Sequence, residues 1–291
     1  MTILHQLDSP LMQRALVEAV LVGALCGAVG VHVLLRRLPF VTLALSHATL
    51  PGVVVASILG VSLYLGGLTA AAVLIAAILL IGSERRLATS TATGVALSGV
   101  FALGVLLQST QPGPSKDLAA FLVGDLFTVQ PGDISVTVGV GVAVALLLGA
   151  FHKELVFGAF DPGGAAAVGY RTSRIDLLVL GVLAVTVVTS IPAVGTILVV
   201  ALVVTPALTA RLWVDRVGPM MLLAATLGAA AGVVGITVSA QWGIAGGAAT
   251  ALSATAFLAL SGAVIGWRSP RSPWRRSPRT APRTAGSPGV A

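Results

Sequence analysis

Long apolar runs, separated by short polar or basic junctions, dominate the chain. A transmembrane helix needs about 17 to 25 predominantly apolar residues. By this criterion the sequence predicts nine spans, at about 15–35, 40–60, 64–82, 92–108, 134–151, 175–191, 194–211, 219–239 and 243–266. A further apolar piece, Leu118–Val129, is too short to cross and is predicted to be a re-entrant helix. The predicted fold class is therefore all-α, a polytopic bundle of about nine transmembrane helices plus one short re-entrant helix.

The basic residues predict the orientation of these spans, because cytoplasmic loops carry an excess of Lys and Arg. With the amino terminus outside, only Arg14 and Lys116 remain on the external side. The basic residues then placed inside are Arg36, Arg37, Arg85, Arg86, Lys153, Arg171, Arg174, Arg211, Arg216 and the arginines of the tail. If Leu118–Val129 crossed the membrane, every later junction would flip and expose its arginines externally. The nine-span arrangement is therefore preferred.

Composition supports the same class of protein. Hydrophobic residues make up 56% of the 291-residue chain and charged residues only 9%, far from the balance of soluble domains. The sequence thus predicts a multi-pass protein of the cell membrane, with a transmembrane domain at 1–266. Residues 267–291 are rich in Arg, Ser and Pro and are predicted to form a disordered basic tail against anionic lipid. The net charge of +7 comes mostly from loop anchors and this tail, so a nucleic-acid partner is not expected.

Several enzymatic motifs are missing from the sequence. A nucleotide-phosphate loop needs a Lys followed by Ser or Thr after a glycine-rich turn, yet the lysines precede Asp117 and Glu154. The sequence contains neither His-Glu-x-x-His nor Gly-x-Ser-x-Gly. Ser46 and His47 are neighbours that point to different faces of a helix, which is unsuitable for a nucleophile and its base. The chain is therefore not expected to be an enzyme, and ATP hydrolysis is expected from a separate subunit.

The segment around His47 is the strongest candidate for function. Histidine is costly in hydrocarbon and usually faces a bundle interior or a polar cavity on an ion or substrate pathway. One turn later, Pro51 and Gly52 weaken the backbone hydrogen bonds of the same span. Together these residues predict a transport pathway with a helix break, although a histidine satisfied within the core remains the alternative.

The junction at about 160–171 predicts a short helix. Asp161 is placed to cap it and Pro162 occupies the favoured first position. An alanine run that includes Ala165 follows, and Gly169 provides a left-handed end. Such a small-residue helix suits a groove on a soluble partner, and an ordinary linker helix is the alternative.

Five short segments, taken in their order along the chain, resemble the membrane permeases of zinc, manganese and iron ABC importers. The residues that carry the resemblance are Leu45–Gly52 after the Arg36-Arg37 pair, Thr91–Gly94, Asp117–Leu126, Asp161–Gly169 and Val194–Arg211. The resemblance implies a divalent metal ion (Mn, Zn or Fe) as substrate, with no permanently bound cofactor. It also implies a second copy of the chain as homodimer partner, cytoplasmic ATPase subunits and an extracytoplasmic metal-binding protein. In this family the Asp161–Gly169 helix would be the segment coupled to the ATPase.

One position departs from that family. Its members commonly carry Asp one turn before the histidine, where this sequence has Leu43. The candidates for the missing oxygen are Glu18 and Asp125. Glu18 is otherwise an interfacial carboxylate near Arg14, and Asp125 is otherwise a capping or solvated acid. His32, one turn before Arg36, is expected to be an interfacial anchor.

The sequence therefore predicts the transmembrane permease subunit of an ATP-binding-cassette importer for a divalent transition metal. A secondary transporter or ion channel remains the alternative, in which intramembrane acids would couple protons or ions.

Overall fold

The structure, a computed structural model, describes residues 9–82, 89–109, 124 and 129–268. In these ranges the chain is helical and contains no strand, which confirms the all-α prediction. The helices are α2 (Pro10–Leu35), α3 (Pro39–Leu59), α4 (Leu63–Gly82), α5 (Thr89–Ser109), α7 (Pro131–Ala150), α8 (His152–Phe160), α9 (Pro162–Ala167), α10 (Thr172–Val194), α11 (Thr196–Trp213), α12 (Val217–Trp242) and α13 (Gly246–Arg268). Within the described residues, eight of them are long and apolar enough to cross a membrane, and the apolar part of α11, Leu198–Trp213, is shorter.

Each predicted span coincides with one helix, and the differences lie at the ends. The first helix begins at Pro10, five residues earlier than predicted, because Ser9 accepts a hydrogen bond from the backbone of Met12 at 3.3 Å. The sequence did not predict α8, which follows α7 directly. Most of Leu118–Val129 and all of residues 269–291 lie outside the described residues, so the re-entrant helix and the disordered tail stay predictions.

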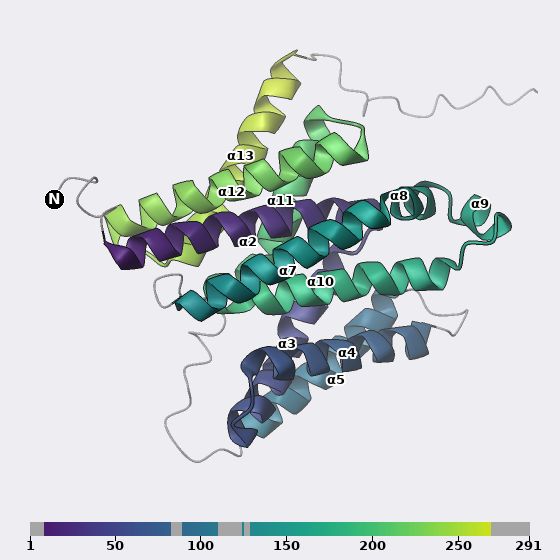
Figure 1. Cartoon of the computed structure of the whole chain (residues 1–291), viewed down its shortest axis with the longest axis horizontal. Coiled ribbons are helices and arrows are strands. Elements are labelled where there is room, and N and C mark those ends of the chain that lie inside the picture. The colour runs from purple at the N-terminus through teal and green to yellow at the C-terminus, as the bar shows by residue number, and fades with distance from the viewer. Residues whose placement is uncertain (1–8, 83–88, 110–123, 125–128, 269–291) are drawn as a thin grey trace, which may run out of the picture.

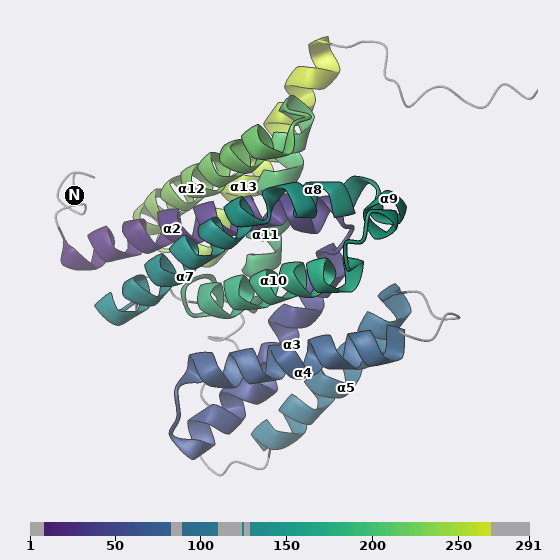
Figure 2. The same cartoon turned by 45° about the vertical axis from the view of Figure 1, so that its right-hand side comes forward.

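The helices gather into two groups with α10 packed against both, while α7 lies along α2 and α10 (Figures 1 and 2). In one group α2 packs along α12, with α11 and α13 beside them. In the other group α3 packs against α4 and α5. The carboxyl ends of α2 and α7, together with α8 and α9, lie at one end of the bundle (Figure 1).

Small residues allow the closest helix contacts. A Cβ atom on Gly23 would lie 2.3 Å from the carbonyl oxygen of Gly228, and one on Gly27 would lie 2.2 Å from that of Ala224. On the other side of the molecule, a Cβ on Gly52 would lie 2.0 Å from the carbonyl oxygen of Gly66. Close backbone approach of this kind stabilises helix pairs in lipid, where burial of apolar surface adds little between helices.

Two polar contacts mark the two ends of the bundle. Arg36, at the α2–α3 turn, forms an ion pair with Asp176 in the first turns of α10. Tyr64, at the start of α4, donates a hydrogen bond to Asp133, at the start of α7, over 2.7 Å. The α2–α3 turn and the start of α10 therefore share one end, as the nine-span arrangement requires.

Candidate functional site

His47 lies in the first half of α3 and is half-buried. Its ring meets the ring of Phe101 from α5 edge-on, with 5.6 Å between centroids and an angle of 78° between the planes. Leu43 is also half-buried, whereas Ala44, Leu45 and Ser46 between them are buried. Leu43 and His47 therefore share a side of α3 that is less covered than the three residues between them.

Pro51 and Gly52 lie inside α3, which continues to Leu59, so the predicted break is confined to the backbone hydrogen bond that Pro51 cannot make. Proline has no N–H, so Pro51 cannot donate to the carbonyl oxygen of His47, four residues earlier. A Cβ on Gly104 of α5 would lie 2.8 Å from the Pro51 ring, so α5 approaches the helix break closely. An apolar groove of about 590 Å³ between α3, α4 and α5 is lined by Pro51 and Gly52. The structure thus places a carbonyl oxygen without its helical donor on the residue that also carries the imidazole.

Glu18 belongs to a polar cluster at the opposite end of the bundle from Arg36. Glu18 is 1% exposed, so it is buried within the bundle and does not have the solvent contact that the interfacial alternative requires. Thr137 Oγ1 of α7 donates to Glu18 Oε1 over 2.6 Å, whereas Glu18 Oε2 is buried without a hydrogen-bond partner. Asp133 lies one turn before Thr137 on the same face of α7, accepts the Tyr64 hydroxyl, and interacts electrostatically with Glu18.

The sequence did not single out Tyr64, Asp133 or Thr137. Asp133 does carry a local signal, because it follows Pro131 by two residues and its Oδ2 accepts from the backbone N–H of Gln130 at 3.0 Å, as a helix-capping acid does. Nothing along the chain indicates that this acid also meets Tyr64.

The remaining candidates are divided between the core and the undescribed segment. His32 is 1% exposed and neither ring nitrogen has a hydrogen-bond partner, so the expected interfacial anchor is wrong. Asp125 lies outside the described residues. Its neighbour Gly124 is described and lies against the α10–α11 junction, where a Cβ would be 2.3 Å from the backbone nitrogen of Gly195.

His47 and Glu18 are not brought together into a metal-binding group. Within the described ranges no set of three or more His, Cys, Asp or Glu side chains is arranged to hold a metal ion. His47 contacts α5, whereas Glu18 contacts α7. The two residues thus mark separate places in the bundle.

The predicted surface helix is present as α9. Asp161 Oδ1 accepts a hydrogen bond from the backbone of Gly164 at 2.8 Å, and Pro162 is the first helical residue. At the other end, Gly169 has a φ of 94°, and Tyr170 N–H reaches the carbonyl oxygen of Ala165 at 3.0 Å. These two bonding patterns fix both ends of a helix that would be too short to persist alone.

Ala165 faces its own chain. It is fully buried at 0% exposure, whereas Val168 is 72% exposed. Pro162, Ala166 and Ala167 are exposed as well. The surface that α9 offers to a partner is therefore formed by residues other than Ala165, which holds the helix in place.

Together, the apolar helices, the proline break beside a half-buried histidine and the capped surface helix define a multi-pass membrane protein of the permease class. The chain belongs to the ABC 3 transport family, whose model matches residues 8–264.

Named relatives cover most of the chain. It is 35% identical over 250 residues to the manganese transport system membrane protein MntC of Halalkalibacterium halodurans, covering 86% of each chain. It is 31% identical over 239 residues to the zinc transport system membrane protein TroC of Treponema pallidum, covering 79% of this chain and 80% of that one. The structure of PsaBC from Streptococcus pneumoniae in complex with Fab superposes with a TM-score of 0.82 at 34% identity, over 89% of this chain and 94% of that chain.

Proposed function

We propose that this chain is the permease subunit of an ATP-binding-cassette importer that moves a divalent transition-metal ion, manganese or zinc, into the cytoplasm. The observation that carries the proposal is the environment of His47, a half-buried imidazole on a membrane-spanning helix whose own carbonyl is freed by Pro51. Relatives named for manganese and zinc transport support the choice of ion.

The proposed pathway uses His47 as its nitrogen ligand, with Pro51 and Gly52 as the break that frees an oxygen. Imidazole binds manganese and zinc, and a carbonyl oxygen is a ligand that suits manganese. Such a site has fewer strong ligands than a storage site, as transport requires, because the ion must also leave. Glu18 and Asp125 are proposed as the acids of the same pathway, with Glu18 near its external entrance.

We assign ATP hydrolysis to separate cytoplasmic subunits, since the sequence contains no nucleotide-phosphate loop. The proposed docking surface is α9 with its exposed residues Pro162, Ala166, Ala167 and Val168. Asp161 and Gly169 fix the ends of this helix, and Ala165 anchors it to the bundle. The other proposed partners are a second copy of the chain, which would cover part of its exposed apolar surface, and an extracytoplasmic metal-binding protein.

Metal uptake tests the proposal. The chain is produced with its ATPase subunit and metal-binding protein in cells lacking other manganese and zinc importers, and uptake of radioactive manganese and zinc is measured. We expect uptake with the native ATPase subunit and none when its nucleotide-binding lysine is replaced so that it no longer hydrolyses ATP. The amount of permease in the membrane should be the same in both cases. Uptake that continues with the inactive ATPase would instead indicate a secondary transporter or channel and overturn the proposal.

A further inference from the structure

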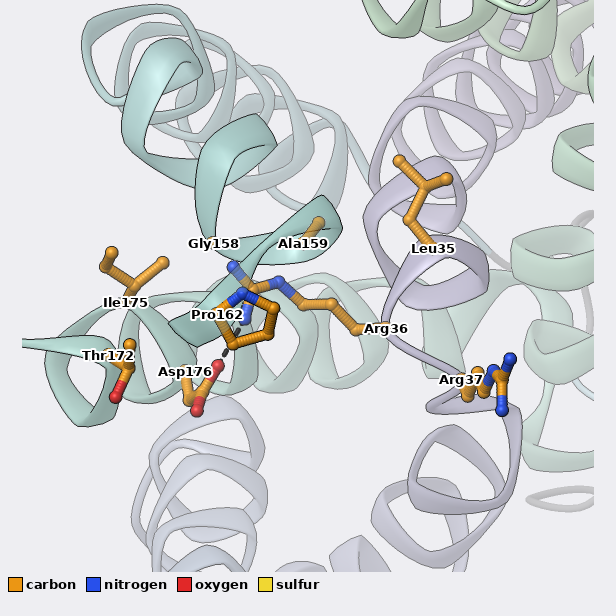
Figure 3. A pocket seen from close by; sticks show the side chains of 9 residues that line it. All are labelled: Leu35, Arg36, Arg37, Gly158, Ala159, Pro162, Thr172, Ile175 and Asp176. Carbon is orange, nitrogen blue, oxygen red and sulfur yellow. Dashed lines mark hydrogen bonds and ion pairs between the residues drawn. The ribbon is translucent and has the colours of Figure 1, made fainter. Parts of the chain in front are cut away.

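The side chain of Arg36 contacts the chain on both sides of α9. Arg36 lies at the end of α2, and its guanidinium reaches between α8 and α10 (Figure 3). Nη1 forms an ion pair with Asp176 of α10, and Nη2 donates a long hydrogen bond to the carbonyl oxygen of Leu155 in α8, at 3.4 Å. Because α9 is the segment between these two helices, Arg36 connects both of its flanks to the α2–α3 turn.

The Arg36 guanidinium is nearly buried, but not all of its hydrogen-bond donors have a partner. The Arg36 side chain is 9% exposed, and its Nε has no hydrogen-bond partner. Gly158 makes room for it, since a Cβ there would lie 3.3 Å from Nη2. The Asp176 side chain is 55% exposed, and water screens such a pair, so it contributes little to folding stability. Stability alone therefore does not explain why a nearly buried arginine stands here.

A cavity separates α9 from the α2–α3 turn at this point. It measures about 250 Å³ and is lined by Pro162, Thr172 and Gly158, with Arg36 crossing it (Figure 3). Side chains do not fill this space, so close packing does not fix the distance between α9 and the turn. The two polar contacts of Arg36 are what span it.

The turn after Arg36 is stiff enough to pass a displacement on to α3. Arg37 has a φ of 58°, which is rare for a residue other than glycine. The backbone of Arg37 bonds to the carbonyl of Leu34 at 3.1 Å, and that of Leu38 bonds to Val33 at 2.9 Å. Pro39 then begins α3, the helix that carries His47 two turns later.

We propose that Arg36 is a positioning residue that transmits movement of α9 to α3, so that ATP hydrolysis and opening of the pathway at His47 stay linked. This inference rests on the proposed function, since it takes α9 as the ATPase docking helix. It gives Arg36 a role beyond a loop charge, because the contacts join α8, α10 and the start of α3.

The test measures metal ions transported per ATP hydrolysed by the complete complex in proteoliposomes. Arg36→Gln should leave assembly and basal ATP hydrolysis near the native level and lower the transport ratio by about tenfold, within the usual range of coupling between sites. Asp176→Asn should lower the ratio less, by about threefold, because the contact with Leu155 remains. The matched control is Arg37→Gln, which removes the same charge from the neighbouring residue, whose side chain points away from Asp176 (Figure 3).

A charge exchange, compared at equal amounts of folded complex, separates positioning from folding. The double variant Arg36→Asp with Asp176→Arg should recover a higher ratio than Arg36→Asp alone. If the two variants differ only in the amount of folded complex and not in the ratio, the role of the pair is structural and the inference is overturned. If Arg36→Gln does not assemble, Asp176→Asn decides, and an unchanged ratio there overturns the inference. If the native complex transports metal and the Arg36→Gln complex has the same transport ratio, this inference is overturned and the proposed function stands. Native complexes without ATP-dependent transport would overturn the proposed function itself.

Discussion

Thr137 Oγ1 lies 2.6 Å from Glu18 Oε1, although 119 positions separate the two residues in sequence. The contact joins α2 to α7 and leaves Glu18 Oε2 buried without a partner. A buried carboxyl with unused hydrogen-bonding capacity is unusual in a stable bundle. Glu18 is thus either a structural tie between α2 and α7 or, as proposed above, an acid of the substrate pathway.

The first prediction separates these two roles. Glu18→Gln keeps the shape of the side chain but removes its charge, and we expect metal uptake to fall by about tenfold, as for loss of a group that tunes a metal site. Thr137→Val is the matched control, since it removes the hydrogen bond and leaves the carboxyl. Uptake should then stay within about twofold of native, with stability lowered by about 1 kcal/mol. Native uptake by Glu18→Gln would exclude Glu18 from the pathway.

The second prediction concerns the orientation in the membrane. Ser135, near the start of α7, and Ser173, near the start of α10, are both exposed, whereas the native Cys26 is fully buried. Single cysteines at Ser135 should react with a membrane-impermeant maleimide in intact cells. Those at Ser173 should react only after the membrane is opened, and native protein should not react in either condition. External labelling at Ser173 would contradict the nine-span arrangement.

The third prediction concerns docking at α9. Val168→Glu introduces a charge on the exposed end of this helix, and we expect copurification of the ATPase subunit to fall by about tenfold, as at a strong interface position. Val168→Thr has a similar shape and should retain the partner. Ala165→Arg should act differently: because Ala165 is fully buried, a large side chain should lower the amount of folded permease. A Val168→Glu complex that assembles normally would place the ATPase contact elsewhere.

The local elements of the fold could be predicted from the sequence because their causes are local. Apolar runs determine the spans, and Asp161, Pro162 and Gly169 indicate both ends of α9 without any tertiary information. Which side of α9 faces the bundle could not be predicted in this way. That Ala165 faces inward while Val168 is exposed depends on how α9 packs against α8 and α10, and a run of alanines carries no such information.

The polar contacts of the bundle could not be predicted, because they join residues far apart in sequence. Arg36 and Asp176 are 140 positions apart, and Tyr64 and Asp133 are 69 apart. Each residue alone resembles an ordinary polar side chain of a loop or helix end. The interfacial prediction for His32 is wrong because its spacing from Arg36 indicates the membrane interface, whereas packing of the surrounding helices leaves it only 1% exposed.

The fourth prediction tests the glycine contact between α2 and α12. A Cβ on Gly228 would lie 2.1 Å from the carbonyl oxygen of Gly23, whereas one on Gly139 of α7 would meet no atom within 4 Å. Gly228→Ala should therefore separate the helices and lower the free energy of unfolding by about 1 to 3 kcal/mol. Gly139→Ala is the matched control and should leave it unchanged or raise it slightly, because alanine favours a helix more than glycine does. The measurement is thermal unfolding of the purified protein in detergent, and equal stability of the two variants would contradict the observed packing.

The last prediction returns to α3. Leu43 and His47 lie one turn apart on the same half-buried side of the helix. His47→Ala should lower manganese uptake by about tenfold or more, because it removes the proposed nitrogen ligand. Leu43→Asp should place a carboxylate beside the imidazole and strengthen metal binding. Tighter binding slows release, so we expect an increased affinity in equilibrium binding together with a lower maximal rate of uptake. Leu43→Asn is the matched control, since it has nearly the same shape without the charge. Native uptake in His47→Ala would move the pathway away from this face of α3, and unchanged affinity in Leu43→Asp would show that the ion does not pass between these two residues.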